Sequence, residues 1–376
     1  MLGMVGDADL VLMNDPQAAR PVRVLLATRV AARPEQVRQA LVLAASYGKA
    51  MPAFRRIEVI ARHERAPGVT DSQVAWELDV PLWNLQGKLW LRPQADGVDL
   101  VLEEGDFAPG LFHLTARGEK TGKSDRCILV VEGYANVAEA NVAARQLVRR
   151  SPLAEPAMTV AAAYVMLKSL ARLAEDVSAG RPSAALAPPE SSSFAGERTG
   201  TAALAFPRAR GLLAAVRSRP DGRLAGVEVA VPASARAGQR AKGGLRPELF
   251  SALPGWKKIE LVSETPDTCQ DPGASCWAVQ TNLPLFSLDG TWKIRPRPWR
   301  ARMVAGDREG ALMGIDVVSA KKPAGLAVVL SEQPRLDRAG FVARKLVAAE
   351  PYLEHGLALA LTLADAASLV PALERE

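Results

Sequence analysis

The residue with the clearest capacity for acid–base chemistry is His113, one of only three histidines in the chain. It follows a Glu-Gly-Asp-Phe stretch that contains Asp106. Because imidazole titrates near neutral pH, a histidine beside a carboxylate in apolar surroundings can take up and return a proton. We expect His113 to lie near Asp106 and keep it as a candidate catalytic residue. An ordinary exposed histidine is the competing interpretation.

Other catalytic patterns fail on inspection. Arg117-Gly-Glu-Lys-Thr-Gly-Lys-Ser124 is close to a phosphate-binding P-loop, but Arg117 stands where the first glycine is required. The residues that follow, from Cys127 to Val131, indicate a strand where a P-loop needs a helix, so a hairpin turn is expected. No Gly-x-Ser-x-Gly or Gly-x-Gly-x-x-Gly motif is present. Three isolated histidines do not suggest a metal centre, and we expect neither metal nor cofactor.

A basic stretch offers a possible contact with an anionic membrane surface. It consists of Arg295, Arg297, Trp299, Arg300 and Arg302. Arginines around a tryptophan suit lipid headgroups, but a solvated strand edge interrupted by prolines has the same composition. The net charge of the chain is only +6 over 376 residues. Without a recognised binding motif, we expect no nucleic-acid partner.

The cysteines bear on location. Cys269 and Cys276 flank a turn-like Gln-Asp-Pro-Gly-Ala-Ser loop, which leaves a disulfide and two reduced thiols both open. Cys127 lies in an apolar run and is expected to be a core residue. The start of the sequence shows no signal-peptide pattern and the longest apolar stretch is too short for a membrane span, so a cytoplasmic location is expected. A disulfide in a processed chain would favour the periplasm instead.

The elements that must position these residues occur twice. Met51-Pro-Ala-Phe is repeated as Leu253-Pro-Gly-Trp, and Val80-Pro-Leu-Trp is repeated as Leu283-Pro-Leu-Phe. A third block pairs Ala144-Arg-Gln-Leu-Val with Ala343-Arg-Lys-Leu-Val. A spacing near 200 residues is far longer than a solenoid repeat, so the sequence predicts two tandem domains.

A segment rich in proline and serine separates the two copies, and we place a linker at residues 179–200. The predicted domains are then residues 20–178 and 201–376. Each copy is expected to run from a short helix, beginning at Pro34 in the first, through five or six strands to a long closing helix. Apolar and polar residues alternate from Val74 to Val80 and from Leu85 to Arg92, as in an antiparallel sheet with one covered face.

This order resembles the helix-grip superfamily, also called SRPBCC, which includes START lipid-transfer domains, coenzyme Q-binding proteins and polyketide aromatase/cyclases. The resemblance rests on Met51-Pro-x-Phe-x-x-Ile-Glu-Val, Trp76-x-Leu-x-Val-Pro-Leu, Glu104-Gly-Asp-Phe with Gly110-x-Phe112, and the closing helix. It implies an α+β fold with two tandem domains, each a curved antiparallel sheet wrapped round a C-terminal helix. In the second domain the Glu-Gly-Asp-Phe counterpart departs from the pattern, as Ala305-Gly-Asp-Arg.

The resemblance also implies a cavity between sheet and helix for a hydrophobic ligand such as a lipid, sterol, quinone or polyketide. The candidate ligand-binding residues are Trp76, Leu78, Val80, Leu89, Leu91, Phe107, Phe112, His113, Tyr164, Met166, Trp277, Val279, Trp292, Met303 and Met313. Ordinary core positions follow the same pattern. We expect a non-catalytic binding or transfer protein. A two-domain polyketide aromatase/cyclase is the main alternative, and a structural pair of domains with closed interiors is a third.

Overall fold

The computed structural model describes two compact units, which we call domains 1 and 2. Domain 1 comprises residues 1–189 and 348–356, and domain 2 comprises residues 190–347 and 357–376. Within these bounds the structure describes residues 8–14, 22–80, 83–119, 126–137, 145, 154–181, 211–219, 222–243, 249, 251, 253, 256–262, 273–283, 286–296, 298–320, 325–336, 339, 344–345, 347–348, 350 and 352–375. Most of the predicted linker at 179–200 lies outside the described residues.

Domain 1 is built on an antiparallel sheet with the strand order β1-β2-β8-β7-β6-β5-β4-β3. The strands are β1 (Ala8–Met13), β2 (Val24–Val30), β3 (Phe54–Ala66), β4 (Val69–Val80), β5 (Trp83–Gln94), β6 (Gly97–Gly105), β7 (Phe107–Gly118) and β8 (Cys127–Asn136). From β3 to β8 each strand pairs with its successor, so this part is a meander of hairpins. β2, from the start of the domain, pairs with β8, the last strand of this meander.

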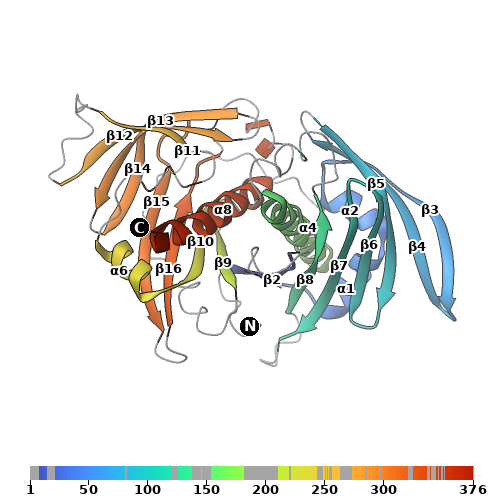
Figure 1. The fold of residues 1–376 in the computed structure, drawn as a ribbon. Helices are drawn as coiled ribbons and strands as arrows, with labels where there is room; N and C mark the ends of the chain where they lie inside the picture. Colours follow the sequence, from blue (N-terminus) through green and yellow to red (C-terminus); the bar gives the residue numbers. More distant parts are fainter. Residues whose placement is uncertain are drawn as a thin grey trace. The chain divides into compact units, whose positions relative to one another are not determined.

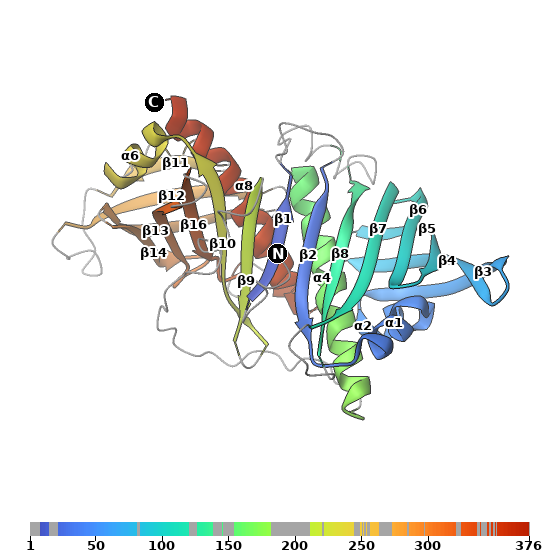
Figure 2. The same cartoon turned by 90° about the horizontal axis from the view of Figure 1, so that it is seen from below.

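Among the described residues of domain 1, three helices cover one face of this sheet. They are α1 (Pro34–Val42), α2 (Ala44–Ala50) and α4 (Ala154–Ser178). Proline at the first helical position suits the start of α1, and the backbone N–H of Arg33 donates to Gln36 Oε1 at 3.0 Å. The long helix α4 packs most extensively on β2 and β8, and the sheet curves around it (Figures 1 and 2).

Domain 2 repeats this plan with the strand order β11-β12-β13-β14-β15-β16-β10-β9. Its strands are β9 (Leu212–Ser218), β10 (Leu224–Ala233), β11 (Trp256–Leu261), β12 (Ser275–Leu283), β13 (Phe286–Pro296), β14 (Trp299–Gly306), β15 (Leu312–Ala320) and β16 (Gly325–Gln333). Its helices are α6 (Ala235–Gly243) and the closing helix α8 (Leu353–Arg375), both labelled in Figure 1.

The predicted fold class is confirmed, because each half is an antiparallel sheet that ends in a long helix. The expectation that a helix comes first is wrong: β1 and β2 precede α1, and β1 lies ahead of residue 20. Residues on both faces of these two strands are mostly buried, so the strands lack the alternation used to recognise the others. The single helix expected to begin at Pro34 is two helices, since Leu43 adopts an extended conformation between them.

Both closing helices are long and apolar enough, by length and composition, to cross a membrane. Two thirds of the apolar window of each helix is buried inside the protein. This burial fits the place of each helix in the interior of its domain, where its apolar surface meets the apolar face of a sheet.

Candidate functional site

One face of the domain 1 sheet is directed toward α4, and the strand register identifies its residues. Lys168 Nζ on α4 donates to Thr28 Oγ1 at 3.2 Å, so the side chain of Thr28 points toward that helix. Thr28 pairs with Leu129, which pairs with Ala116 on β7. Since paired residues share a face and side chains alternate along a strand, Phe112 also faces α4.

The register carries this face across the rest of the sheet. Phe112 pairs with Leu100, and Leu100 pairs with Leu91. Leu91 pairs with Ser72 on β4. Val74 and Trp76 lie two and four residues after Ser72, so their side chains are on the same face of the strand. Phe112, Leu100, Leu91 and Trp76 are all buried. The strands therefore place these apolar side chains on the face that the resemblance predicted for a ligand.

An aromatic pair lies at the far end of this face. The rings of Trp76 and Phe107 stack at 6.1 Å with an angle of 17° between their planes. Phe107 adopts a φ of +72°, a conformation that few residues other than glycine take up. Such strain persists only where the surroundings impose it, and it is frequent at functional positions. This turn holds the Phe107 ring against the indole.

Two glycines make room for this pair. A Cβ at Gly87, opposite Trp76 in the register, would lie 2.8 Å from the Cζ2 atom of the indole and 2.5 Å from the Glu104 carbonyl oxygen. Gly105 has a φ of +89°, and a Cβ there would lie 2.3 Å from the carbonyl oxygen of Gln86. The turn is closed by Asp106, whose Oδ2 accepts the backbone N–H of Gln86 at 2.8 Å. The Gly-Asp-Phe sequence is thus needed to present Phe107.

The indole nitrogen of Trp76 has an unusual position. It is buried, and it finds no hydrogen-bond partner among the residues that the structure describes. Leaving a buried donor unpaired costs about 1–3 kcal/mol, so buried indole N–H groups normally have an acceptor. A ligand oxygen beside the Trp76–Phe107 pair would supply one.

A polar cluster on the same face was not predicted. Asp9 on β1 accepts hydrogen bonds from Tyr164 Oη on α4 at 2.6 Å and from Thr28 Oγ1 at 2.5 Å. Lys168 Nζ also reaches Asp9, at 3.1 Å. Tyr164 was expected to orient the polar end of a ligand, and its hydroxyl is here bonded to Asp9. The signal in the sequence is the single acid in the apolar Ala8–Met13 run, which lay before the assumed start of the domain.

His113 lies on the opposite face of the sheet. It follows Phe112 in β7, so its side chain points away from α4. The expected neighbour, Asp106, is not its partner: His113 Nδ1 lies 2.5 Å from Asp99 Oδ1 on β6. Both side chains are partly exposed, at 38% and 25%. This geometry does not bring His113 to the α4-facing side, where a ligand would be held.

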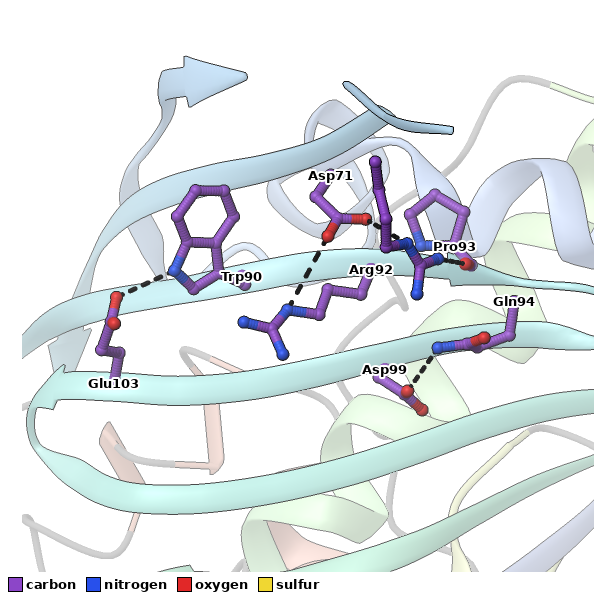
Figure 3. Close-up of polar contacts among 8 residues, drawn as sticks. Asp71, Trp90, Arg92, Pro93, Gln94, Asp99 and Glu103 are labelled. Atoms are coloured by element: carbon purple, nitrogen blue, oxygen red, sulfur yellow. Dashed lines mark hydrogen bonds and ion pairs between the residues drawn. The ribbon is translucent and has the colours of Figure 1, made fainter. Parts of the chain in front are cut away.

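Figure 3 shows how polar side chains connect on this outer face. Asp71 and Arg92 form an ion pair of 3.9 Å between β4 and β5. Trp90 Nε1 donates to Glu103 Oε2 at 2.9 Å, and Gln94 Nε2 donates to Asp99 Oδ2 at 2.6 Å (Figure 3). Asp99 therefore contacts both Gln94 and His113 across neighbouring strands, which accounts for the histidine structurally.

The remaining predicted residues of domain 1 follow the same strands and helix. Leu78 and Leu89 are half-buried on the α4-facing side, and Met166 is half-buried on α4. The backbone of Val80 ends β4, while its side chain lies outside the described part of the structure. The structure thus brings Trp76, Leu78, Leu89, Leu91, Phe107 and Phe112 to one side of the sheet.

Domain 2 contains a second copy of the turn at Asp106. Gly306 has a φ of +114°, a Cβ there would lie 2.3 Å from the Asp289 carbonyl oxygen, and Asp307 Oδ2 accepts the backbone N–H of Asp289 at 2.8 Å. The next residue is Arg308, where domain 1 has Phe107. Its guanidinium carbon lies 5.9 Å from the ring centroid of Trp292. A charged side chain therefore replaces an aromatic one at a matching position.

Two carboxyl groups accompany Arg308 in the interior. Thr362 on α8 donates to Glu332 Oε2 on β16 at 3.0 Å, so Glu332 faces the closing helix. Asp365, one turn further along α8, hydrogen-bonds to Glu332 and to Trp256. Arg308, Glu332 and Asp365 are exposed by only 7–8%. We call these three residues the buried ionic cluster; their sequence separation explains why no local pattern revealed them.

Burial controls the protonation of this cluster. Loss of hydration raises the pKa of Glu332. The hydrogen bond from Thr362 and the charge of Arg308 lower this pKa and partly offset the increase. Burial, together with the nearby charge of Glu332, raises the pKa of Asp365 well above its ordinary value. Of the two carboxyl groups, Asp365 therefore keeps its proton to the higher pH, within its hydrogen bond to Glu332.

The predicted apolar residues of domain 2 lie on β12, β13, β14 and β15. Val279, Trp292, Met303 and Met313 are buried, while Trp277 is half-buried. Met313 pairs directly with Glu332, and Trp277 pairs with Trp292. Trp256 packs on Trp292 with 5.9 Å between the ring centroids. Sequence patterning found this apolar set but not the charged groups within it.

The basic stretch does not present its tryptophan to a surface. Trp299 is only 2% exposed, so its indole does not lie at the surface, and contact of this stretch with a membrane stays a prediction. Arg300 forms a bidentate pair with Asp316, with distances of 2.9 and 3.0 Å. Arg295 and Arg302 are exposed, and Arg297 lies outside the described residues. A tryptophan held in the interior leaves only the arginines for contact with anions.

The cysteines differ in state. Cys276 is disulfide-bonded, whereas Cys127 is free and buried. Cys269, the predicted partner of Cys276, lies outside the described residues. In the described part of the chain no group of three or more histidine, cysteine and acidic side chains is arranged to hold a metal ion.

No family model matches the chain, and no curated protein matches its sequence. Among solved structures, a START superfamily protein from Mycobacterium smegmatis is 15% identical with a TM-score of 0.32, and the match covers 42% of this chain and 97% of that one. The matches that extend over both domains include two di-domain proteins. The di-domain ARO/CYC StfQ from the steffimycin biosynthetic pathway is 12% identical with a TM-score of 0.27, covering 91% of this chain and 97% of that one. The di-domain ARO/CYC BexL from the BE-7585A biosynthetic pathway is 10% identical with a TM-score of 0.27, covering 92% and 98%. Because a fold hosts many functions, the function of this chain must come from its own side chains.

Proposed function

We propose that the chain is a binding protein for an apolar ligand with a ring system and a carbonyl oxygen, held in domain 1 between the sheet and α4. The observation that carries this proposal is the buried indole N–H of Trp76, which lacks an acceptor among the described residues. Aromatic ketones, quinones and polyketides share the required chemistry. Transfer of such a ligand between partners is the wider role that this binding would serve.

The surroundings of Trp76 suit such a ligand. Phe107 stacks on the indole, and Leu91, Leu100 and Phe112 continue the apolar face away from this pair. A planar ring can pack on these side chains, with burial contributing about 25 cal/mol per Å² of apolar surface. A carbonyl oxygen accepting from Trp76 Nε1 would then fix the orientation of the ring.

A matched pair of probes tests this assignment. 9-Fluorenone and fluorene differ by one carbonyl group, and their binding to the full chain can be compared by isothermal titration calorimetry. We expect fluorenone to bind more tightly by about threefold to tenfold, the range that one hydrogen bond supports. Equal affinities for the two probes, or no binding of either, would contradict the proposal.

Variants separate the hydrogen bond from the apolar contact. Trp76→Phe keeps an aromatic ring but removes the donor, so fluorenone should lose its advantage while fluorene binding changes little. Trp90→Phe is the matched control, because Trp90 lies on the outer face, where its indole donates to Glu103. If both variants alter fluorenone binding equally, Trp76 has no special role. Extraction of protein purified without delipidation would identify the natural ligand.

A cyclase or aromatase acting on the same class of ligand is a second candidate. It requires an acid–base group on the helix-facing side, and His113 of domain 1 points away from that side. The buried carboxyls of domain 2 favour this candidate, because a proton-sharing pair can donate and accept. Heptane-2,6-dione, which closes to 3-methylcyclohex-2-enone with loss of water, provides a direct assay. Cyclisation that exceeds the buffer rate and disappears in Asp365→Asn would support an enzyme, and an unchanged rate would exclude this reaction.

A further inference from the structure

The buried ionic cluster of domain 2 is not required by the fold. Met313 on β15 pairs with Glu332 on β16. The corresponding pair in domain 1 is Phe112 on β7 with Gly133 on β8, so Glu332 takes the position of a glycine. Arg308 matches Phe107, and the repeat places Asp365 at the position of Met166. Domain 1 therefore builds the same architecture with a phenylalanine, a glycine and a methionine. Buried ion pairs seldom stabilise a protein more than well-packed apolar residues would, so stability does not explain the cluster.

Three polar atoms of this region remain without a partner in the described part of the chain. They are Arg308 Nε, Trp292 Nε1 and Oε1 of Glu332, all buried. Arg308 and Trp292 are donors, whereas the Glu332 oxygen is an acceptor. Arg308 lies over the ring of Trp292, and its charge acts on both carboxyl groups. The unpaired atoms thus belong to one cluster.

The charge balance restricts what these atoms can bind. With a proton on Asp365, the charges of the Arg308 guanidinium and the Glu332 carboxylate balance each other. A charged ligand would disturb this balance in a buried setting, where an unpaired charge is costly. Two donors suit the two lone pairs of a carbonyl oxygen, and the single acceptor suits a hydroxyl group. Trp256 and Trp292 add apolar ring surfaces beside them.

We propose that domain 2 holds a separate binding site at Arg308, Trp292 and Glu332 for a neutral molecule that carries both a carbonyl and a hydroxyl group. The carbonyl oxygen accepts from Arg308 and Trp292, and the hydroxyl donates to Glu332. Asp365 positions Glu332 through the hydrogen bond between the two side chains. This site differs in chemistry from the face of domain 1, where the unpaired atom is a single donor.

Three small probes test the assignment: 2-hydroxyacetophenone with both groups, acetophenone with the carbonyl alone, and ethylbenzene with neither. Binding is measured by isothermal titration calorimetry on the full chain carrying Trp76→Phe, so that the domain 1 donor does not contribute. We expect affinity to fall from the first probe to the third, by about threefold to tenfold at each step. Equal affinities, or no binding, would overturn the proposal.

Two variants locate the contacts. Glu332→Gln should weaken 2-hydroxyacetophenone about tenfold and leave acetophenone nearly unchanged, because only the hydroxyl needs the carboxylate. Trp292→Phe keeps the ring and should weaken both ketones, which keeps the test valid if Glu332→Gln does not fold. Asp316→Asn is the control, since Asp316 pairs with the exposed Arg300 and should change neither affinity.

A crystal structure soaked with 2-hydroxyacetophenone decides between a ligand site and a hydrated core. Density for the probe on Arg308 and Glu332 would support the site. Ordered waters on the three atoms, with the probe absent, would show a structural cluster only and overturn it. Failure of this site leaves the fluorenone experiment on Trp76 unaffected, because that experiment uses the unmodified chain and a different domain.

Discussion

Phe107 and Arg308 occupy the same position in two copies of one turn. Each follows a glycine with positive φ and an aspartate whose carboxylate accepts a backbone N–H two strands earlier in the chain. Phe107 then stacks on Trp76, while Arg308 lies over Trp292. The backbone of the repeat is thus retained while the chemistry of its interior has diverged.

This relationship predicts how domain 2 responds to loss of its cation. Arg308→Phe leaves Glu332 and Asp365 without a buried counter-charge, and breaking such a pair costs about 3–5 kcal/mol. The triple variant with Glu332→Gln and Asp365→Asn removes the charges together and should recover most of that loss. Urea unfolding of the three proteins measures the difference. A single variant as stable as the triple one would show that Arg308 does not balance the carboxyls.

The pH dependence of stability should reveal Glu350, a buried residue of domain 1. Burial raises its pKa from 4.5 to about 7, although Ser169 and backbone N–H groups partly offset this effect. The folded state therefore binds a proton that the unfolded state releases above pH 4.5. Its contribution to stability is complete below pH 4.5 and is lost as pH rises to 7, a decrease of roughly 3 kcal/mol.

Glu350→Gln should remove this contribution. The difference in unfolding free energy between wild type and variant is expected to shrink or change sign as pH rises from 4.5 to 7, which denaturant titrations at several pH values can follow. Glu58→Gln is the control, because Glu58 is exposed and pairs with exposed Arg56. A pH-independent difference for Glu350→Gln would contradict the raised pKa.

Gly87 should be intolerant of a side chain. Gly87→Ala would place a Cβ against the Glu104 carbonyl oxygen and the indole of Trp76, at 2.5 and 2.8 Å. Forced overpacking of this kind costs about 1–3 kcal/mol and would displace Trp76. Gly118→Ala is the control, since its Cβ would meet only Pro34, at 3.7 Å. Thermal unfolding and fluorenone titration should both change for Gly87→Ala and stay close to wild type for Gly118→Ala.

The disulfide at Cys276 predicts how many free thiols the protein contains. Denatured but unreduced protein should contain one free thiol per chain, that of Cys127, and reduction should raise the count to three. Three free thiols before reduction would rule out the disulfide and remove the case for an oxidising compartment.

The periodicity of apolar residues predicted the strands in which apolar and polar residues alternate, and it missed the strands without that alternation. The alternation around Val74 and Leu89 identified the sheet and its apolar face, and the apolar run after Glu155 identified α4. β1 and β2 were missed because both of their faces are buried. The buried ionic cluster joins residues 24 and 33 positions apart, so only tertiary structure brings them together.

The misplacement of His113 could have been avoided from the sequence, and it yields the sharpest test of the site. Neighbouring residues of a strand point to opposite faces, so Phe112 and His113 cannot both face a ligand.

We expect His113→Asn to leave fluorenone affinity unchanged and to cost at most about 1 kcal/mol of folding stability through its partly exposed contact with Asp99. Phe112→Ala should weaken fluorenone binding severalfold, because it removes apolar surface from the face that holds the ligand. The same calorimetric titration serves both variants. If His113→Asn abolished binding while Phe112→Ala did not, the ligand would lie on the outer face, and the assignment of the α4-facing side would be wrong.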